Sequence, residues 1–280
     1  MLKIAAAQIE TPLGDLDANR RKHLSVIDDA RAAGVQILLF PELSLVGHSG
    51  GREAPRLAMT ADHAILRELS MASGDMFTIV GAVEEAPGAL FFNSAFGLSH
   101  GQVRLLHRKI NLATYGQLED GKFFGIGQSL KVHPLRTPWQ AAVMICADLW
   151  NPALVHLAAM SGASLLLAPV SSAREAVGEF FDNSEGWTVN TRFHAMTYGF
   201  PLVLANRVGR EGSLTFWGGS RILDPTGHAI AQAGDEEAMI TATIDYDSVR
   251  QARFLLPTVR DGAASFLARA FTHLADGTAS

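Results

Sequence analysis

The sequence predicts a single α/β domain in which helices cover the faces of buried sheets. Segments typical of strands alternate with segments typical of helices along most of the chain. Hydrophobic residues make up 48% of the 280 residues and charged residues only 18%, which indicates a globular protein with a sizeable core. No glycine-rich linker or low-complexity tract divides the sequence, so we expect one domain over residues 1–280.

The first half of the chain predicts strands and helices in turn. Asp17 can cap the first helix, whose apolar residues at 24, 27 and 30 share one face before Gly34 ends it. A buried type of strand follows and stops at Pro41. Three closely spaced strands with turn signals between them suggest antiparallel neighbours. In chain order, the expected elements are strand 5–9, the capped helix, strand 35–40, a helix around 61–71, and strands 77–83, 90–98 and 103–109.

The second half repeats this alternation. Asn151 and Pro152 place a helix cap and a first-turn proline ahead of a helix that Gly162 follows. Segments 222–224 and 240–244 are expected to form hairpin-like strands. In chain order, the other expected elements are strand 141–145, helix 153–161, strand 165–168, helix 187–198 and strand 202–205.

The C-terminal stretch 264–274 has apolar residues at helical spacing, including Phe266 and Phe271. The simpler interpretation is a last helix packed on its own domain. The alternative is a segment that reaches over a partner subunit, so residues from about 246 to 280 form a tail available for subunit contacts.

Charge and cysteine content exclude several classes of protein. The net charge of −5 at pH 7, without any block of like charge, argues against nucleic acid and anionic membranes as partners. No apolar run approaches the roughly 20 residues of a membrane span, and residues 1–8 show no signal-peptide pattern. The single cysteine, Cys146, cannot form an intrachain disulfide, which fits a reducing compartment. We therefore expect a cytoplasmic protein.

Three reactive residues stand at the ends of three expected strands: Glu42, Lys109 and Cys146. Ligands bind outside the carboxyl ends of strands in open α/β sheets, so these groups are placed to converge. Taken singly, each has a simpler interpretation. A charged residue after a strand is usually a solvated loop residue, and a lone cysteine is usually an inert buried hydrophobe.

The sequences around these residues resemble the motifs of the nitrilase superfamily of carbon–nitrogen hydrolases. Phe-Pro-Glu-Leu at 40–43 is similar to its glutamate motif, and Arg-Lys-Ile-Asn-Leu at 108–112 to its lysine motif. Ile-Cys-Ala-Asp-Leu-Trp at 145–150 is similar to its cysteine motif. The resemblance extends from residue 3 to about 245, with the motifs in the family's order.

This resemblance implies a four-layer α-β-β-α sandwich, no metal or organic cofactor, and subunits that pair into a homodimer or a higher homo-oligomer. It also implies a catalytic triad of Glu42, Lys109 and Cys146.

The residue types suit hydrolysis of an amide. An amide carbonyl is a poor electrophile, so attack needs a thiolate rather than a thiol. Lys109 can stabilise the thiolate, and Glu42 can accept its proton. The ammonium of Lys109 and the backbone N–H after Cys146 can then stabilise the oxyanion of the tetrahedral intermediate.

A further acid follows the lysine. Residues 115–124 resemble the corresponding segment in the branch that contains the glutaminase domains of NAD synthetases. Glu119 and Asp120 are both candidates for an auxiliary acid that orients Lys109 or the substrate, and Glu119 is favoured. The alternative is a solvated pair of loop acids.

Candidate substrate contacts come from the same loops. They are His48, Tyr115, Ala147, Ser171, Ser172 and Trp187. Ala147, Trp150 and His48 depart from residues common in the family, which puts the identity of the substrate in doubt. Charged residues between Ser172 and Trp187 leave an ionic substrate group open; they include Arg174, Glu175, Glu179 and Asp182.

Three rival interpretations remain. Gly-His-Ser-Gly-Gly at 47–51 matches the nucleophile elbow of serine hydrolases, with Asp224 and His228 as possible partners, but no strand leads directly into it. The second is a metal site, but the ten histidines show no metal-binding spacing. The third interpretation is a non-catalytic scaffold.

We expect a hydrolase that cleaves a small linear amide or N-carbamoyl compound and releases ammonia. A nitrilase, or a glutaminase-like subunit, is the alternative.

Overall fold

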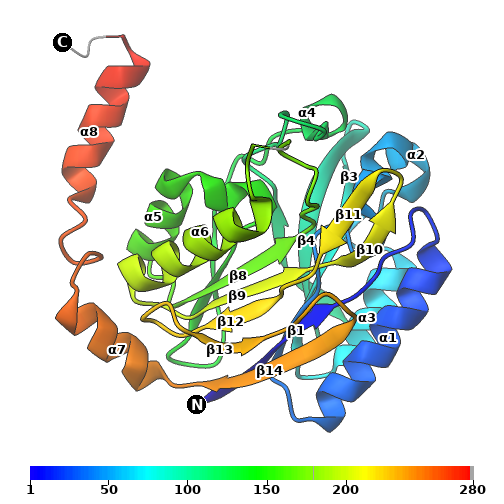
Figure 1. The fold of residues 1–280 in the computed structure, drawn as a ribbon, viewed down its shortest axis with the longest axis horizontal. Coiled ribbons are helices and arrows are strands. Elements are labelled where there is room, and N and C mark those ends of the chain that lie inside the picture. The colour runs from blue at the N-terminus through cyan, green and yellow to red at the C-terminus, as the bar shows by residue number, and fades with distance from the viewer. Residues whose placement is uncertain (179, 278–280) are drawn as a thin grey trace.

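The computed structural model describes residues 1–178 and 180–277, and in it two sheets pack face to face between two layers of helices (Figure 1). Within the described residues, each sheet has six strands. The first has the order β14 (Ala238–Ile244), β1 (Leu2–Gln8), β2 (Ile37–Leu39), β3 (Phe77–Ala86), β4 (Leu90–Ser99) and β5 (Gln102–Arg108). The second has the order β13 (Ala229–Gln232), β12 (Arg221–Leu223), β9 (Leu202–Asn206), β8 (Leu165–Val170), β7 (Gln140–Val143) and β6 (Val132–Pro134). The predicted α-β-β-α sandwich is confirmed.

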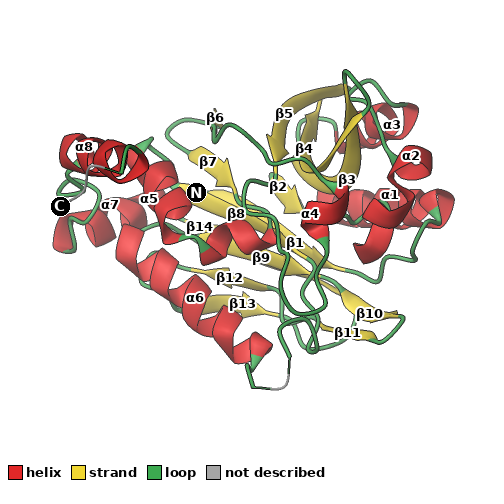
Figure 2. Ribbon diagram, turned by 90° about the horizontal axis from the view of Figure 1, so that it is seen from above, coloured by secondary structure: helices red, strands yellow, loops and turns green. Residues whose placement is uncertain are grey.

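Helices flank the sheets on both outer sides, as the view from above shows (Figure 2). They are α1 (Leu16–Ala32) and α3 (Ala64–Ser73) over the first sheet, and α5 (Pro152–Met160) and α6 (Asn183–Tyr198) over the second. Two short helices, α2 (Ala54–Leu57) and α4 (Asp120–Phe123), lie in the loops, and a separate hairpin joins β10 (Val208–Glu211) to β11 (Leu214–Trp217). Glu179 and the last three residues of the expected tail lie outside the described part of the chain.

The alternation of side chains along the strands explains the four layers. In β1, Ile4 and Ala6 pack between the two sheets, whereas Ala5 and Ala7 pack toward the helices. The strands of the second sheet alternate in the same way between the inter-sheet core and the helices α5 and α6. Because both faces of the sheets are buried at their centres, the central strands β1, β2, β8 and β9 are largely continuous apolar runs rather than alternating ones.

The helix caps agree with the sequence in one case and differ in another. Asn151 caps α5, because its Oδ1 accepts from the Ala153 N–H at 3.1 Å. The cap of α1 is Asp15, which accepts from the Ala18 N–H at 2.9 Å, and not Asp17. Asp17 lies in the first turn and pairs with arginines one turn further along. A carboxylate in a first turn also favours the helix dipole, which makes the two acids hard to tell apart from sequence.

The strands β3, β4 and β5 are antiparallel neighbours, as predicted. The expected hairpin between 222–224 and 240–244 is wrong. β12 pairs with β9 and β13, while β14 crosses to the other sheet and pairs with β1 along its whole length. The turn before β13 is closed by Asp224, whose Oδ1 accepts from the N–H groups of Thr226 and His228. β13 itself is short and largely exposed, so it carries little hydrophobic signal.

The C-terminal tail divides into two helices. α7 (Tyr246–Leu255) packs on the sandwich through the buried Val249, and Arg253 donates to the Ala163 carbonyl at 2.6 Å. α8 (Ala264–Ala275) extends beyond it at the edge of the molecule (Figure 1). All of α8 is described and none of its residues is buried, so the expectation that it packs on its own domain is wrong. Its contact with a partner subunit stays a prediction.

Across 1–178 and 180–277, every helix is too short or too polar to cross a bilayer.

A buried histidine supports the loop that carries Glu42. His23 on α1 contacts the Asn19 carbonyl through Nδ1 at 2.7 Å and the Ser44 hydroxyl through Nε2 at 2.9 Å. Its ring stacks on Phe40 with centroids 4.1 Å apart. Burial lowers the pKa of His23 from 6.5 to about 4, so the ring is neutral at pH 7.

This histidine should make the protein less stable in mild acid. The unfolded chain binds a proton at His23 below about pH 6.5, while the folded protein does so only near pH 4. The free energy of unfolding should therefore fall by about 2 kcal/mol between pH 7 and pH 5 on account of this group. Denaturant unfolding at both pH values measures it. His23→Gln should be less stable than the wild type at pH 7, but its free energy of unfolding should fall less between pH 7 and pH 5. If that fall were as large in His23→Gln as in the exposed control His228→Gln, the assignment would be contradicted.

Candidate active site

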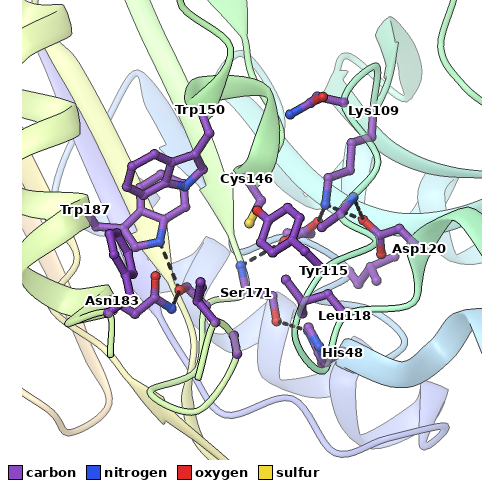
Figure 3. Close-up of a pocket in the computed structure, with 18 residues that line it drawn as sticks. His48, Lys109, Tyr115, Leu118, Asp120, Cys146, Trp150, Ser171, Asn183 and Trp187 are labelled. Carbon is purple, nitrogen blue, oxygen red and sulfur yellow. Dashed lines mark hydrogen bonds and ion pairs between the residues drawn. The ribbon is translucent and has the colours of Figure 1, made fainter. Parts of the chain in front are cut away.

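Three strand ends bring Glu42, Lys109 and Cys146 to one pocket with a volume of about 390 Å³. Figure 3 shows Lys109 and Cys146 among the residues that line it. Glu42 follows β2, Lys109 follows β5 directly, and Cys146 follows β7. The convergence expected from the sequence is therefore present.

Lys109 connects two carboxylates inside the protein. Its Nζ donates to Glu42 Oε1 at 2.7 Å and to Asp120 Oδ2 at 2.6 Å. The side chains of Lys109 and Glu42 are only 2% and 4% exposed, so water does little to weaken this network. Glu42 Oε1 also accepts from Asn93 Nδ2 at 2.8 Å, and Oε2 accepts from the Ser171 N–H at 2.9 Å. The carboxylate of Glu42 is thus held in one orientation.

Cys146 sits on a strained turn. Its φ is +46°, a left-handed value that non-glycine residues rarely adopt. It opens the 3₁₀ turn Cys146–Trp150, which follows β7 after two residues. A sharp change of direction at this point lets the side chain leave the sheet and enter the pocket.

Asp148 holds the cysteine turn against the lysine loop. Its Oδ1 accepts from the N–H groups of Ile110 and Asn111 at 3.0 and 2.7 Å. Its Oδ2 accepts from the Ile145 N–H at 3.0 Å and contacts His107 Nε2 at 3.1 Å. The backbone after Lys109 and the side chain of His107 before it are thereby tied to the backbone of Ile145, the residue before Cys146. Asp148 is fully buried, so each of these bonds satisfies a carboxylate that water cannot reach.

The thiol and the lysine have shifted pKa values. Burial and the Glu42 carboxylate raise the pKa of the Cys146 thiol well above its usual value, and Lys109 only partly opposes them. Burial alone would lower the pKa of Lys109, but Asp120, Glu42 and Cys146 together raise it well above its usual value. These shifts favour the protonated thiol and the ammonium form of Lys109, so a base is needed to take the thiol proton before attack.

Five of the six predicted substrate contacts line this pocket: His48, Tyr115, Ser171, Ser172 and Trp187. Ala147 does not line it; its side chain is buried and its carbonyl accepts from Asn111 Nδ2. His48 Nδ1 contacts the Ser171 hydroxyl at 2.9 Å, and burial lowers the pKa of His48. Burial raises the pKa of Tyr115 to about 12.

The two candidate auxiliary acids point in different directions. Asp120 contacts Lys109, and its Oδ2 also accepts from the Ala113 N–H at 3.2 Å. Glu119 instead pairs with Arg52 and Lys122 at the surface and does not line the pocket. The preference for Glu119 is wrong, because the short helix α4 begins between the two acids and turns only the second inward.

Asp120→Asn should lower kcat/KM by roughly 10- to 100-fold, because hydrogen bonds to charged groups are worth about 1.5–3 kcal/mol. It should also move the alkaline limit of the pH profile to lower pH, since Asp120 raises the pKa of Lys109. Ammonia release as a function of pH measures both effects. Glu119→Gln is the matched control and should stay within about twofold of the wild type. Equal losses in both variants, or an unmoved pH limit in Asp120→Asn, would contradict this placement.

The rival sites are not assembled. Ser49 lies in the 3₁₀ helix His48–Glu53, and its N–H donates to Glu211 at 2.8 Å. Asp224 and His228 lie in the turn between β12 and β13 and contact each other there. In the described part of the chain, no group of three or more histidine, cysteine, aspartate or glutamate residues is placed to hold a metal ion.

The family model for carbon-nitrogen hydrolases matches residues 3–254. The chain belongs to the carbon–nitrogen hydrolase family. Among curated members of this family, a glutamine-dependent NAD(+) synthetase of Thermotoga maritima is 27% identical over 88% of this chain. An N-carbamoylputrescine amidase of Solanum lycopersicum is 30% identical over 65% of it. The chain spans 42% of the synthetase and 64% of the amidase.

Solved structures of carbon–nitrogen hydrolases share the fold. A glutamine-dependent NAD+ synthetase of Acinetobacter baumannii matches 89% of this chain with a TM-score of 0.80 and 24% identity, over 46% of its own length. An amidase from Nesterenkonia sp. matches 91% of this chain with a TM-score of 0.77 and 24% identity, over 94% of its length.

Several lining residues were not anticipated from the sequence. They are Leu43, Asn111, Ala113, Leu118, Trp150, Ala176, Val177, Phe181 and Asn183. Leu43, Asn111 and Trp150 belong to the glutamate, lysine and cysteine motifs, which was a usable signal. Most of the others lie in loops whose path depends on the whole fold.

Proposed function

We propose that this carbon–nitrogen hydrolase cleaves the C–N bond of a small linear amide or N-carbamoyl compound through a thioester on Cys146. The observation that carries this proposal is the buried network in which Lys109 joins Glu42 and Asp120 beside the Cys146 thiol. It supplies a nucleophile, a base and a cation in one pocket.

In the first half-reaction, Sγ of Cys146 attacks the amide carbon while its proton passes to Glu42. The base is needed at this step because the pKa of the thiol is raised. Glu42 Oε2 accepts one described hydrogen bond, from Ser171, which leaves a lone pair for the proton. Two of the three Nζ hydrogens of Lys109 are used by carboxylates, and the third can stabilise the oxyanion together with the Ala147 N–H.

The protonated Glu42 then gives its proton to the departing nitrogen, the C–N bond breaks, and ammonia leaves. In the second half-reaction Glu42 takes a proton from water, and the hydroxide oxygen bonds to the thioester carbon. The S–C bond breaks and the sulfur recovers the proton from Glu42. The acid and the free enzyme are released, with one water consumed.

A related structure supports a nucleophilic role for the cysteine. In a glutamate-to-glutamine mutant of the Nesterenkonia amidase, the acetamide moiety of fluoroacetamide is covalently added at the active-site cysteine. The test is to incubate this protein with fluoroacetamide and separately with a panel of amides, N-carbamoyl compounds and the matching nitriles. We expect a mass adduct on Cys146 and ammonia from the amides or carbamoyl compounds. Ammonia from nitriles alone, or no adduct and no ammonia, would contradict the proposal.

A further inference from the structure

One side of the pocket is built of aromatic rings. Trp150 ends the turn that begins with Cys146, Trp187 lies on α6, and Phe181 lies in the loop before α6. The Trp150 ring meets Trp187 edge to face with centroids 5.2 Å apart, and it meets Phe181 in the same way at 5.9 Å. We call these three side chains the aromatic wall. In Figure 3 the two tryptophans lie on the side of Cys146 away from Lys109.

The side-chain N–H groups of Trp187 and Asn183 are already used within the protein. Trp187 Nε1 donates to the Ser172 hydroxyl at 3.0 Å. Asn183 Nδ2 donates to the same hydroxyl at 2.7 Å and to the Ala173 carbonyl at 2.7 Å. These donors are therefore not free to recognise a carboxylate on a ligand.

Formal charge is confined to the other side of the pocket. Of the described residues that line it, the charged ones are Glu42, Lys109 and Asp120, and they pair with one another. Within the described part of the loop before α6, the charged residues add no formal charge to the pocket. Glu175 accepts from the Thr215 N–H, Asp182 caps α6, and neither lines the pocket.

We propose that the substrate is an uncharged amide whose acyl group is apolar and lies against the aromatic wall. This inference rests on the proposed hydrolysis at Cys146 and narrows it to a substrate class. Transfer of a phenyl-sized group from water to such a wall favours binding by roughly 10- to 100-fold. A carboxylate or ammonium at the same position loses its hydration without gaining a counter-ion, so ionised amides of equal length are disfavoured.

The test is a set of amides that share one chain length and differ in charge. Pentanamide is neutral, 5-aminopentanamide cationic, glutaramate anionic, and glutamine zwitterionic. The second neutral substrate is 3-phenylpropanamide, which adds a ring. We expect kcat/KM for ammonia release to be at least about tenfold higher for the two neutral amides than for the three ionised ones. A preference for any ionised amide over pentanamide would overturn the inference.

Variants of the aromatic wall test its place in the pocket. Trp150→Ala should lower kcat/KM for 3-phenylpropanamide roughly 10- to 100-fold more than for acetamide. Trp150→Arg should raise the ratio of glutaramate to pentanamide, because it supplies the missing counter-ion. Phe254→Ala, on the exposed face of α7, is the matched control. It should leave two kcat/KM ratios unchanged, that of 3-phenylpropanamide to acetamide and that of glutaramate to pentanamide.

The outcomes separate this inference from the proposed function. Ammonia release that requires Cys146 but prefers ionised amides, or unchanged ratios in both folded Trp150 variants, would overturn the inference and leave the hydrolase proposal standing. No ammonia from any amide and no fluoroacetamide adduct would instead overturn the proposed function. If both Trp150 variants fail to fold, the substrate series on the wild-type enzyme still decides.

Discussion

Cys146→Ala is expected to abolish ammonia release, with kcat reduced by at least about 10⁴-fold, because it removes the single thiol of the chain, on which the proposed acyl intermediate forms. The alanine leaves Glu42, Lys109 and Asp120 in place, so the pocket should still bind amides. Ammonia release measures the loss, and a ligand-induced rise in Tm shows that binding persists.

Ser49→Ala is the control for this variant, since Ser49 occupies the centre of the sequence that resembles a serine nucleophile elbow. Its N–H contacts Glu211 through the backbone, which the substitution preserves. It should hydrolyse amides at the wild-type rate. Substantial activity in Cys146→Ala, combined with loss in Ser49→Ala, would reverse the assignment of the nucleophile.

Glu42→Gln should reduce kcat/KM by roughly 10²- to 10⁴-fold, because an amide cannot accept the thiol proton. It should also make Cys146 react faster with iodoacetamide near pH 8. Glu42 raises the pKa of the thiol, so its neutral replacement lowers that pKa. Each pKa unit of lowering increases the thiolate fraction about tenfold. The variant thus separates formation of the thiolate from catalysis.

Two further measurements on Glu42→Gln test this conclusion. The amide nitrogen of the new glutamine must face either the Ser171 N–H or the donors of Asn93 and Lys109, which costs about 1–3 kcal/mol of stability, so the Tm should be checked first. In a folded variant, alkylation that slows in parallel with amide hydrolysis would show that Glu42 deprotonates the thiol of the free enzyme, contrary to the raised pKa.

The sequence was sufficient to place the catalytic candidates because each stands at the end of an expected strand and within a motif that resembles the family's. Glu42 and Cys146 follow apolar runs typical of buried strands, and their order along the chain fits two parallel β-α units. Lys109 ends an antiparallel series that closely spaced turns made visible. Signals of this kind are local, so they can be recognised without knowledge of the tertiary structure.

What the sequence could not supply depends on contacts between distant segments. The choice between Glu119 and Asp120 is decided by Ala113 and Arg52, which hold one acid inward and the other outward. The aromatic wall combines the cysteine turn with the loop and helix around residues 181–187, and no periodicity links them. Strand β14 shows an exposed and partly buried alternation that fits an edge of either sheet.

The pairing of β1 with β14 has a consequence for synthesis of the protein. Leu2 is opposite Ile244, so the first strand leaves the ribosome long before its outer neighbour exists. Gln8 adds to this dependence, because it donates to the Gly234 and Glu236 carbonyls. Until Ala238–Ile244 has been synthesised, the nascent chain therefore carries an uncovered apolar strand edge, the kind of edge that recruits other chains. The first sheet of this fold is therefore completed only after Ile244 has left the ribosome.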